Sequence, residues 1–141
     1  MSTRKGFTII EITVVIAIIS ALFAITLPRV SGFIDRIELH AAVSEIESMF
    51  SLARHVAIAR GSQVILDIDA TRGDMTLRSS NGNIRTSEVG RAHGVTLATN
   101  KTSITYSPIG VGYGAANLSL VVSRQQTVDT VVISRLGRVR H

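Results

Sequence analysis

A long apolar run near the N-terminus constrains this chain more than any other feature. Residues 7–27 read FTIIEITVVIAIISALFAITL and carry a single charge, that of Glu11. As an α-helix they would extend about 31 Å, the thickness of the hydrocarbon core of a bilayer. Arg4 and Lys5 precede the run and Arg29 follows it. Because positive residues favour the cytoplasmic side and the short stub can stay there, we expect one membrane pass, with the N-terminus inside and the remainder exported.

Two common explanations of such a run fit it poorly. A cleaved secretory signal has an apolar core of about 7–15 residues followed by a small-residue cleavage site. This run is longer, and its small residues Ala21 and Ala24 lie inside it. A plain single-span anchor fits the length but leaves Glu11 without a purpose, because a carboxylate in hydrocarbon is costly and usually has a functional partner.

The residues around the start of the run suggest a third explanation. The segment Gly6-Phe7-Thr8-Ile9-Ile10-Glu11 resembles the processing site of type IV prepilins and pseudopilins. The resemblance implies that residues 1–6 are a leader, that a prepilin peptidase of the membrane cuts after Gly6, and that the new amine of Phe7 is methylated. It also implies a filament-assembly role for Glu11, whose carboxylate would neutralise such an amine on a neighbouring subunit. A buried ion pair is tolerable where either charge alone is not.

The apolar run continues into a second helical pattern. Residues 34–60 carry an apolar stripe with charged residues mostly on the other side, which predicts an amphipathic helix. Between the two halves, Pro28 and Gly32 are expected to kink or loosen the helix. Gly61, after Arg60, is a plausible end, so one long helix over residues 7–61 is predicted. The predicted stripe comprises Ile34, Ile37, Ala41, Ala42, Ile46, Met49, Phe50, Ala53, Val56 and Ala57.

Residues 62–141 show a strand-and-turn pattern and are predicted to form a periplasmic antiparallel β-domain with a basic C-terminal tail. The strongest turn signal is the run around Asn81-Gly82, since Asn-Gly adopts positive φ readily. The glycine-rich stretch 109–114 is expected to be irregular or bulged. About seven short strands are predicted, at residues 63–69, 75–78, 84–88, 95–98, 103–106, 118–123 and 129–134. The expected fold class is α+β, with the long helix packed on the antiparallel strands.

Three further segments narrow the resemblance to the GspH/FimT family of minor pseudopilins. They are SLARHVAIARG at residues 51–61, YSPIG at 106–110 and ISRLGRVR at 133–140. The likeness implies a pilin-like fold and a minor subunit, often near the filament tip, of a type IV pilus or a type II secretion pseudopilus. It places the subunit in the bacterial inner membrane, and then in a periplasmic or surface filament with other pilin subunits. One departure is Met75, where many relatives carry a tryptophan early in the β-domain.

The positive charge of the predicted mature chain is concentrated at its C-terminal end. Residues 7–123 hold nine basic and nine acidic side chains, whereas residues 124–141 hold four arginines against one aspartate. A clustered basic segment is typical of phosphate binding, and some pilus members of the family bind DNA through a terminal Gly-Arg-x-Arg. With no aromatic residue in the tail, contact with duplex DNA should be sequence-independent and salt-sensitive. A solvated terminus or a dock for an acidic neighbour explains the same charge. The candidate DNA-binding residues are Arg135, Gly137, Arg138 and Arg140.

Signals of catalysis are weak throughout. The chain has no cysteine, which excludes disulfides, thiol catalysis and cysteine-ligated metals. Its four histidines are scattered, and neither a nucleophile elbow nor a phosphate-binding glycine loop is present. We expect no enzyme, no cofactor and no metal. Three functions remain open: a DNA-binding minor pilin, the minor pseudopilin H of a type II secretion system, and a single-span anchored periplasmic binding module.

Overall fold

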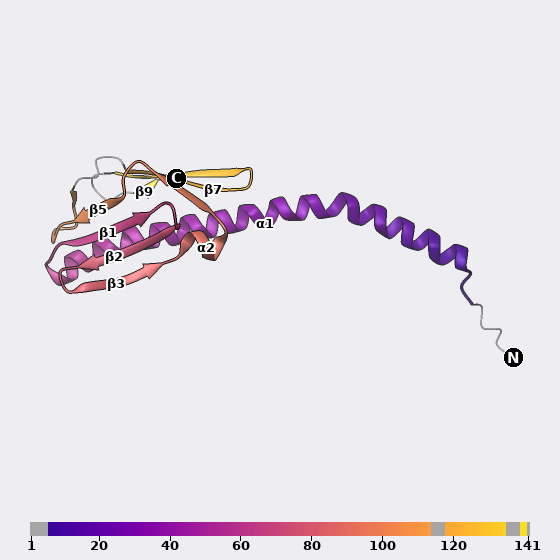
Figure 1. Cartoon of the computed structure of the whole chain (residues 1–141), viewed down its shortest axis with the longest axis horizontal. Coiled ribbons are helices and arrows are strands. Elements are labelled where there is room, and N and C mark those ends of the chain that lie inside the picture. Colours follow the sequence, from indigo (N-terminus) through magenta and orange to yellow (C-terminus); the bar gives the residue numbers. More distant parts are fainter. Residues whose placement is uncertain (1–5, 114–117, 135–138, 141) are drawn as a thin grey trace. The chain divides into compact units, whose positions relative to one another are not determined.

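The structure is a computed structural model that describes residues 6–113, 118–134 and 139–140. The chain divides into an N-terminal unit, residues 1–34, and a C-terminal unit, residues 35–141. One long helix, α1 (Ile9–Arg60), contributes residues to both units. The N-terminal unit contains the apolar part of α1, and the C-terminal unit contains the remainder of α1 together with the strands (Figure 1).

The apolar part of α1 is exposed along its whole length. An 18-residue window of α1 reaches a mean hydropathy of 2.6, and none of that window is buried within the chain. The helix is therefore long and apolar enough to cross a membrane by length and composition. Two of its hydroxyl groups are satisfied internally, since Thr13 donates to the Ile10 carbonyl at 2.8 Å and Thr26 to the Leu22 carbonyl at 2.9 Å. Such bonds suit a segment surrounded by hydrocarbon.

Pro28 and Gly32 do not interrupt α1, which is helical from Ile9 to Arg60. The helix is therefore continuous at both positions, and the predicted kink or loosening does not take the form of a break. A proline removes one backbone donor, and the hydrogen bonds on either side of it can continue the helix.

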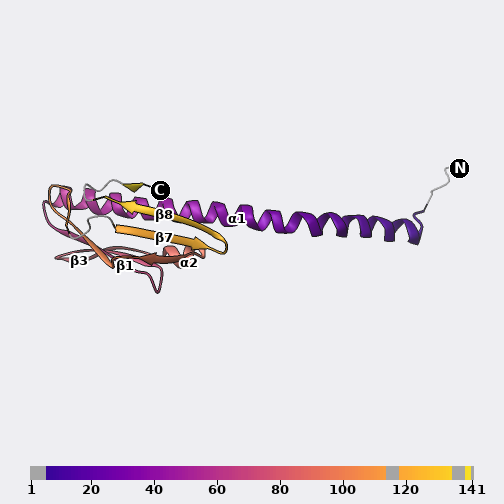
Figure 2. The same cartoon turned by 90° about the horizontal axis from the view of Figure 1, so that it is seen from above.

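The C-terminal unit contains two antiparallel sheets. One has the strand order β3-β2-β1-β5-β6 and the other β4-β7-β8-β9. Figure 1 shows β1, β2 and β3 side by side, and Figure 2 shows the β7–β8 hairpin. The strands are β1 (Val64–Asp69), β2 (Asp74–Ser79), β3 (Gly82–Ser87), β4 (Thr96–Thr99), β5 (Ser103–Tyr106), β6 (Gly112–Tyr113), β7 (Leu118–Arg124), β8 (Thr127–Ile133) and β9 (Val139–Arg140).

The strand prediction was incomplete in three places. All seven predicted strands are present, but the described residues form nine strands in two sheets rather than seven. The additional strands are β6, inside the glycine-rich stretch, and β9, within the basic tail. A five-residue helix, α2 (Val89–His93), was not predicted at all. Each missed element is too short for an apolar period to be recognised in the sequence.

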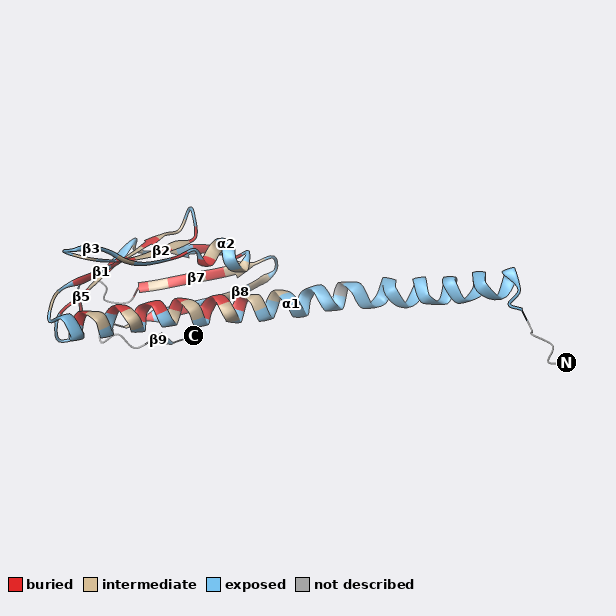
Figure 3. Cartoon of the chain, turned by 90° about the horizontal axis from the view of Figure 1, so that it is seen from below, coloured by how far each residue is buried: buried red, intermediate tan, exposed pale blue. Residues whose placement is uncertain are grey.

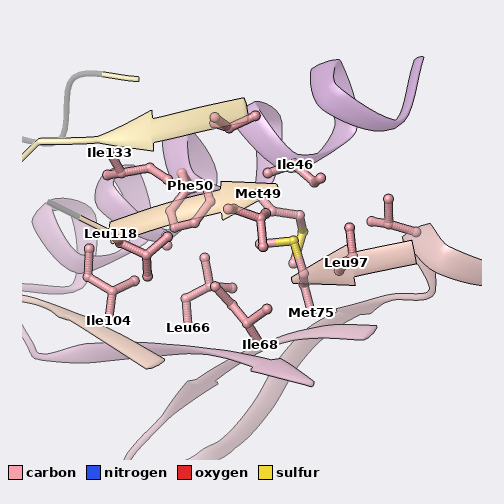
Figure 4. Close-up of a cluster of buried hydrophobic side chains, with 14 of the residues drawn as sticks. Ile46, Met49, Phe50, Leu66, Ile68, Met75, Leu97, Ile104, Leu118 and Ile133 are labelled. Carbon is pink, nitrogen blue, oxygen red and sulfur yellow. The ribbon is translucent and has the colours of Figure 1, made fainter. Parts of the chain in front are cut away.

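The core lies between the second half of α1 and the two sheets. Figure 3 shows a buried stripe along this half of the helix, and Figure 4 shows Ile46, Met49 and Phe50 meeting side chains of both sheets. The α1 residues buried in the core are Leu39, Ala42, Val43, Ile46, Met49, Phe50, Ala53 and Ala57. Met75 on β2, the residue at which this chain departs from the tryptophan of many relatives, is fully buried in the same core.

The predicted stripe was wrong at its first two members. Ile34 is 47% exposed and Ile37 is 51% exposed, whereas Leu39 and Val43 are buried. The buried face of α1 begins where the helix first packs against the strands. Ile34 and Ile37 fit the apolar spacing of the helix, but they lie before this point and have nothing in the chain to pack against.

Candidate functional site

The N-terminal site consists of the residues at the predicted cleavage position and the first turn of α1. Gly6 and Phe7 precede the helix and are exposed, Phe7 by 79%. Thr8 is the residue before the first helical residue, and its hydroxyl accepts a hydrogen bond from the Glu11 backbone N–H at 3.2 Å. The Glu11 carboxylate in turn accepts from the Thr8 backbone N–H at 3.5 Å. This reciprocal arrangement is a capping box, which satisfies two of the free N–H groups at a helix start.

The capping box gives Glu11 a local role that was not predicted from the sequence. The signal was visible in the sequence, since Thr8 and Glu11 have the Thr-x-x-Glu spacing of this motif. A carboxylate in the first turn also interacts favourably with the positive end of the helix dipole. The bond from Thr8 is long at 3.5 Å, so the carboxylate can be given up to a stronger partner at small cost.

The C-terminal arginines are only partly within the structure. Arg140 lies on β9, the edge strand of its sheet, opposite Val132 of β8, and is exposed. The other candidate DNA-binding residues, Arg135, Gly137 and Arg138, lie outside the described residues. The tail is therefore paired with the sheet at residues 139–140, and its one described arginine is open to a ligand.

Arg124, which contributed to the basic excess at the C-terminal end, is used inside the fold. Its Nε donates to the Asp35 carboxylate at 2.8 Å, and its guanidinium also donates to the His93 backbone carbonyl. Only 23% of its side chain is exposed. Arg124 therefore contributes little to the basic surface inferred from the sequence.

A second polar cluster joins α1 to α2 and was not found from the sequence. The His93 Nδ1 atom lies 2.9 Å from a Glu38 carboxylate oxygen, and Nε2 lies 2.9 Å from a Glu45 carboxylate oxygen. The Ser87 hydroxyl donates to the other Glu45 oxygen. Glu38 and Glu45 are two turns apart on one face of α1, which the sequence could have shown. Their partner comes from a helix that the sequence did not reveal.

The described residues contain no group of three histidine or acidic side chains arranged to hold a metal ion. Two acidic side chains near the β1–β2 turn have internal partners. Asp69 accepts hydrogen bonds from the backbone N–H groups of Thr71 and Arg72 and from the Arg72 side chain, and it closes the turn. Asp67 pairs with Arg78 on the neighbouring strand. Among the described residues, the buried Oδ1 atom of Asp74, at the start of β2, has no hydrogen-bond partner.

Comparison with known protein families gives two matches. A family described as type II transport protein GspH matches residues 42–137. A family described as the prokaryotic N-terminal methylation motif matches residues 1–27. A fimbrial protein of Pseudomonas aeruginosa is 37% identical over 65 residues, which are 46% of this chain and 42% of that protein. The chain thus matches less than half the length of this curated relative.

Comparison with solved structures shows the fold. The type IV minor pilin FimU of Pseudomonas aeruginosa matches with a TM-score of 0.64 and 18% identity, covering 77% of this chain and 90% of FimU. The minor pseudopilin EpsH from the Type 2 Secretion System of Vibrio cholerae matches with a TM-score of 0.57 and 13% identity, covering 73% of this chain and 94% of EpsH. The pilin-like α+β fold expected from the sequence is confirmed, and because the GspH match spans well over half of its residues, the chain belongs to the GspH family of minor pilins and pseudopilins.

Proposed function

We propose that this protein is a minor pilin that assembles near the tip of a type IV pilus. Residues 7–27 hold the subunit in the bacterial inner membrane before assembly, and residues 62–141 form its periplasmic domain. The observation that carries the proposal is the match to the methylation motif at residues 1–27, together with the apolar helix that begins at Ile9 and has no buried residue in its hydropathic window. So much apolar surface requires lipid or other subunits to cover it.

The first step of maturation in this proposal is cleavage. The peptidase cuts between Gly6 and Phe7, which are exposed ahead of the first helical residue, and the new amine of Phe7 is methylated. Assembly then withdraws residues 7–27 from lipid into a bundle of neighbouring helices. There the Glu11 carboxylate accepts the Phe7 ammonium of an adjacent subunit. Each charge makes the other tolerable in the apolar bundle.

Mass spectrometry and N-terminal sequencing of the protein from native membranes test this step. The expected product begins at a methylated Phe7. Gly6→Leu should leave the full-length chain, because the peptidase requires the small residue, whereas Ser2→Leu, a similar change elsewhere in the leader, should be processed normally. An untrimmed wild-type chain, or a Gly6→Leu chain that still begins at Phe7, contradicts the proposal and favours a single-span anchored periplasmic binding module.

The alternative machine is a type II secretion system, in which the subunit is the minor pseudopilin H. The family's name and the EpsH likeness support this alternative, and the FimU and fimbrial likenesses support the pilus. Deletion of the gene separates the two machines. Loss of pili or of DNA uptake with normal secretion supports the pilus, and loss of secreted enzymes with normal piliation supports secretion.

A sequence-independent contact with duplex DNA is the second function that an observation favours. The net positive charge of the mature chain lies in its final eighteen residues, and Arg140 is exposed on an edge strand. Arginine binds phosphate in a bidentate manner, and such binding weakens steeply with salt. The binding residues in this proposal are Arg135, Arg138 and Arg140, with Gly137 allowing close approach of the backbone.

Gel shift of duplex DNA with the full chain in detergent micelles tests this contact. We expect weak binding at low salt that Arg138→Ala combined with Arg140→Ala removes. The matched control is Arg72→Ala combined with Arg91→Ala, which removes the same charge from exposed side chains paired with Asp69 and Glu88. Binding that both double variants weaken equally, or that neither weakens, argues against a specific role of the tail.

A further inference from the structure

His93 lies between two carboxylates in a way that only one protonation state satisfies. Both ring nitrogens face a carboxylate oxygen at 2.9 Å, Nδ1 that of Glu38 and Nε2 that of Glu45. A neutral imidazole has one N–H donor, so one of these contacts would place a lone pair against a carboxylate. The imidazolium donates to both. With 18% of its side chain exposed, His93 is also shielded from water that could substitute for either bond.

The charges around this cluster balance only when His93 is protonated. The carboxylates are Glu38 and Glu45 on α1, together with Asp35 one turn earlier on the same helix. The cations are His93 itself, Arg124 from β7, which pairs with Asp35, and Arg85 from β3, which is near enough to lower the pKa of Glu45. Glu88 and Arg91, the other charged residues in and next to α2, pair with each other. Loss of the His93 proton leaves three carboxylates facing two cations.

The helix α2 depends on this cluster for its position. It has five residues and no side-chain cap at its start, so it has little stability of its own. Its remaining ties are the buried side chain of Val89, the hydrogen bond from Gly90 N–H to the Gly73 carbonyl at 2.9 Å, and the bond from Arg124 to the His93 carbonyl. The His93 ring adds hydrogen bonds from α2 to two carboxylates of α1.

We propose that His93, Glu38 and Glu45 form a proton-dependent clamp that docks the α2 segment on α1 and releases it when the imidazole becomes neutral. In the docked state the imidazolium bridges two carboxylates that lie two turns apart on α1. In the released state one bridge is lost, the two carboxylates repel each other, and the segment from Gly90 to Gly94 opens locally while Val89 and Val95 stay in the core. Local opening of this kind is expected for a short segment with three exposed residues, Arg91, Ala92 and Gly94.

The direction of the pH dependence follows from the two partners. The pKa of His93 is raised above 6.5, chiefly by its hydrogen bond with Glu38 and also by that with Glu45. The contribution of His93 to the stability of the docked state is complete below pH 6.5 and is lost as the pH rises through the raised pKa. The pKa of Glu45 is lowered from 4.5 by hydrogen bonds from Ser87 and then His93, so its contribution is lost as the pH falls through that lowered value. The clamp is closed in between and opens on the alkaline side.

NMR of the full chain in detergent micelles, labelled at histidine, measures the first consequence. We expect His93 to titrate above pH 6.5. Glu38→Gln and Glu45→Gln should each lower its pKa, whereas Glu88→Gln, which removes a nearby carboxylate paired with Arg91, should leave it nearly unchanged. Titration of His93 at or below pH 6.5, or indifference to both carboxamide variants, overturns the proposal.

Amide hydrogen exchange of the wild-type chain measures the release itself and does not depend on any variant folding. The reporting amides are Gly90, Ala92 and Val95, which donate to the carbonyls of Gly73, Glu88 and Gly90. After correction for the intrinsic pH dependence of exchange, their protection should fall as His93 deprotonates, by up to about tenfold for each unit of pKa difference between the docked and released states. Unchanged protection across the titration, or an equal loss in the β7–β8 hairpin, overturns the clamp.

Discussion

At the scale of single residues, Glu11 has one partner in the isolated chain and a second in the proposed filament. In the isolated chain its carboxylate completes a capping box with Thr8 through a long hydrogen bond of 3.5 Å. In the proposed filament it neutralises an ammonium on a neighbour. The first role requires only an acceptor oxygen, whereas the second requires a negative charge. The two roles can therefore be separated by substitution.

Glu11→Gln, Glu11→Ala and Thr8→Ala form a series that separates charge from capping. Glutamine at this position preserves a capping box, and alanine removes it. We expect all three chains to be processed at Gly6–Phe7. Both Glu11 variants should be strongly depleted from the sheared filament fraction relative to membranes, as measured by quantitative immunoblot. Thr8→Ala should weaken the first helical turn by about 1 kcal/mol yet assemble nearly as wild type. Normal incorporation of Glu11→Gln would remove the charge-pairing argument.

At the scale of elements, apolar periodicity predicted the long helix and seven strands, and it missed one short helix and two short strands. The helix and all seven predicted strands are present because each has enough alternating or three-to-four spacing to identify its buried face. The helix α2 and the strands β6 and β9 have five, two and two residues and are fixed by tertiary partners. The same reason explains the His93 cluster. Its carboxylates are visible on one helix face, but its histidine belongs to an element that exists only once the sheets are in place.

The position of α2 also depends on two glycines that meet backbone to backbone. A Cβ added at Gly90 would lie 2.8 Å from the Gly73 Cα atom and 3.2 Å from the carbonyl oxygens of Arg72 and Val95. These are backbone atoms of a tight turn and cannot move aside as a flexible side chain would. The close approach requires the absence of a side chain at this crossing.

Gly90→Ala should therefore destabilise the C-terminal unit by about 1–3 kcal/mol, the usual cost of overpacking. Denaturant unfolding followed by circular dichroism measures the change as a lower midpoint with an unchanged slope. Gly32→Ala is the matched control, because nothing lies within 4 Å of a Cβ at this helical position. It should leave the midpoint unchanged or slightly higher, since alanine is the better helix former. A Gly90→Ala midpoint equal to that of wild type would show that the turn can relax.

At the scale of the whole molecule, the exposed apolar surface and the net positive charge lie in separate regions of the sequence. Many of the exposed large apolar side chains lie in the first part of α1, and the large buried side chains of the described residues all lie in the C-terminal unit. The N-terminal methylation motif could be recognised because it depends on local sequence alone, and the cleavage position and the assembly role of Glu11 stay predictions. The basic tail was predicted only by counting charges, and counting does not show which arginines are already paired. Arg124 is the example, since Asp35 neutralises it from a distant part of the chain.

The cooperativity of the C-terminal unit can be tested through a single buried phenol. Tyr106 on β5 is 1% exposed, and burial raises its pKa from 10.0 to about 12. In the unfolded chain the phenol ionises near its ordinary value, so above pH 10.0 the folded state binds more protons than the unfolded state. Stability must then fall as the pH rises from 10.0 to about 12, by roughly 2–3 kcal/mol in total.

Thermal unfolding as a function of alkaline pH measures this loss, and the chain offers its own control. It has two tyrosines and no tryptophan, so near-ultraviolet absorbance reports phenol ionisation without interference. Tyr106→Phe should flatten the alkaline decline, because the titrating group is gone while the ring still packs. Tyr113→Phe, at a position 53% exposed, should leave the decline intact. If Tyr106 ionises before the unit unfolds, the phenol reaches water by local opening of β5, and β5 is then less stable than the rest of the core.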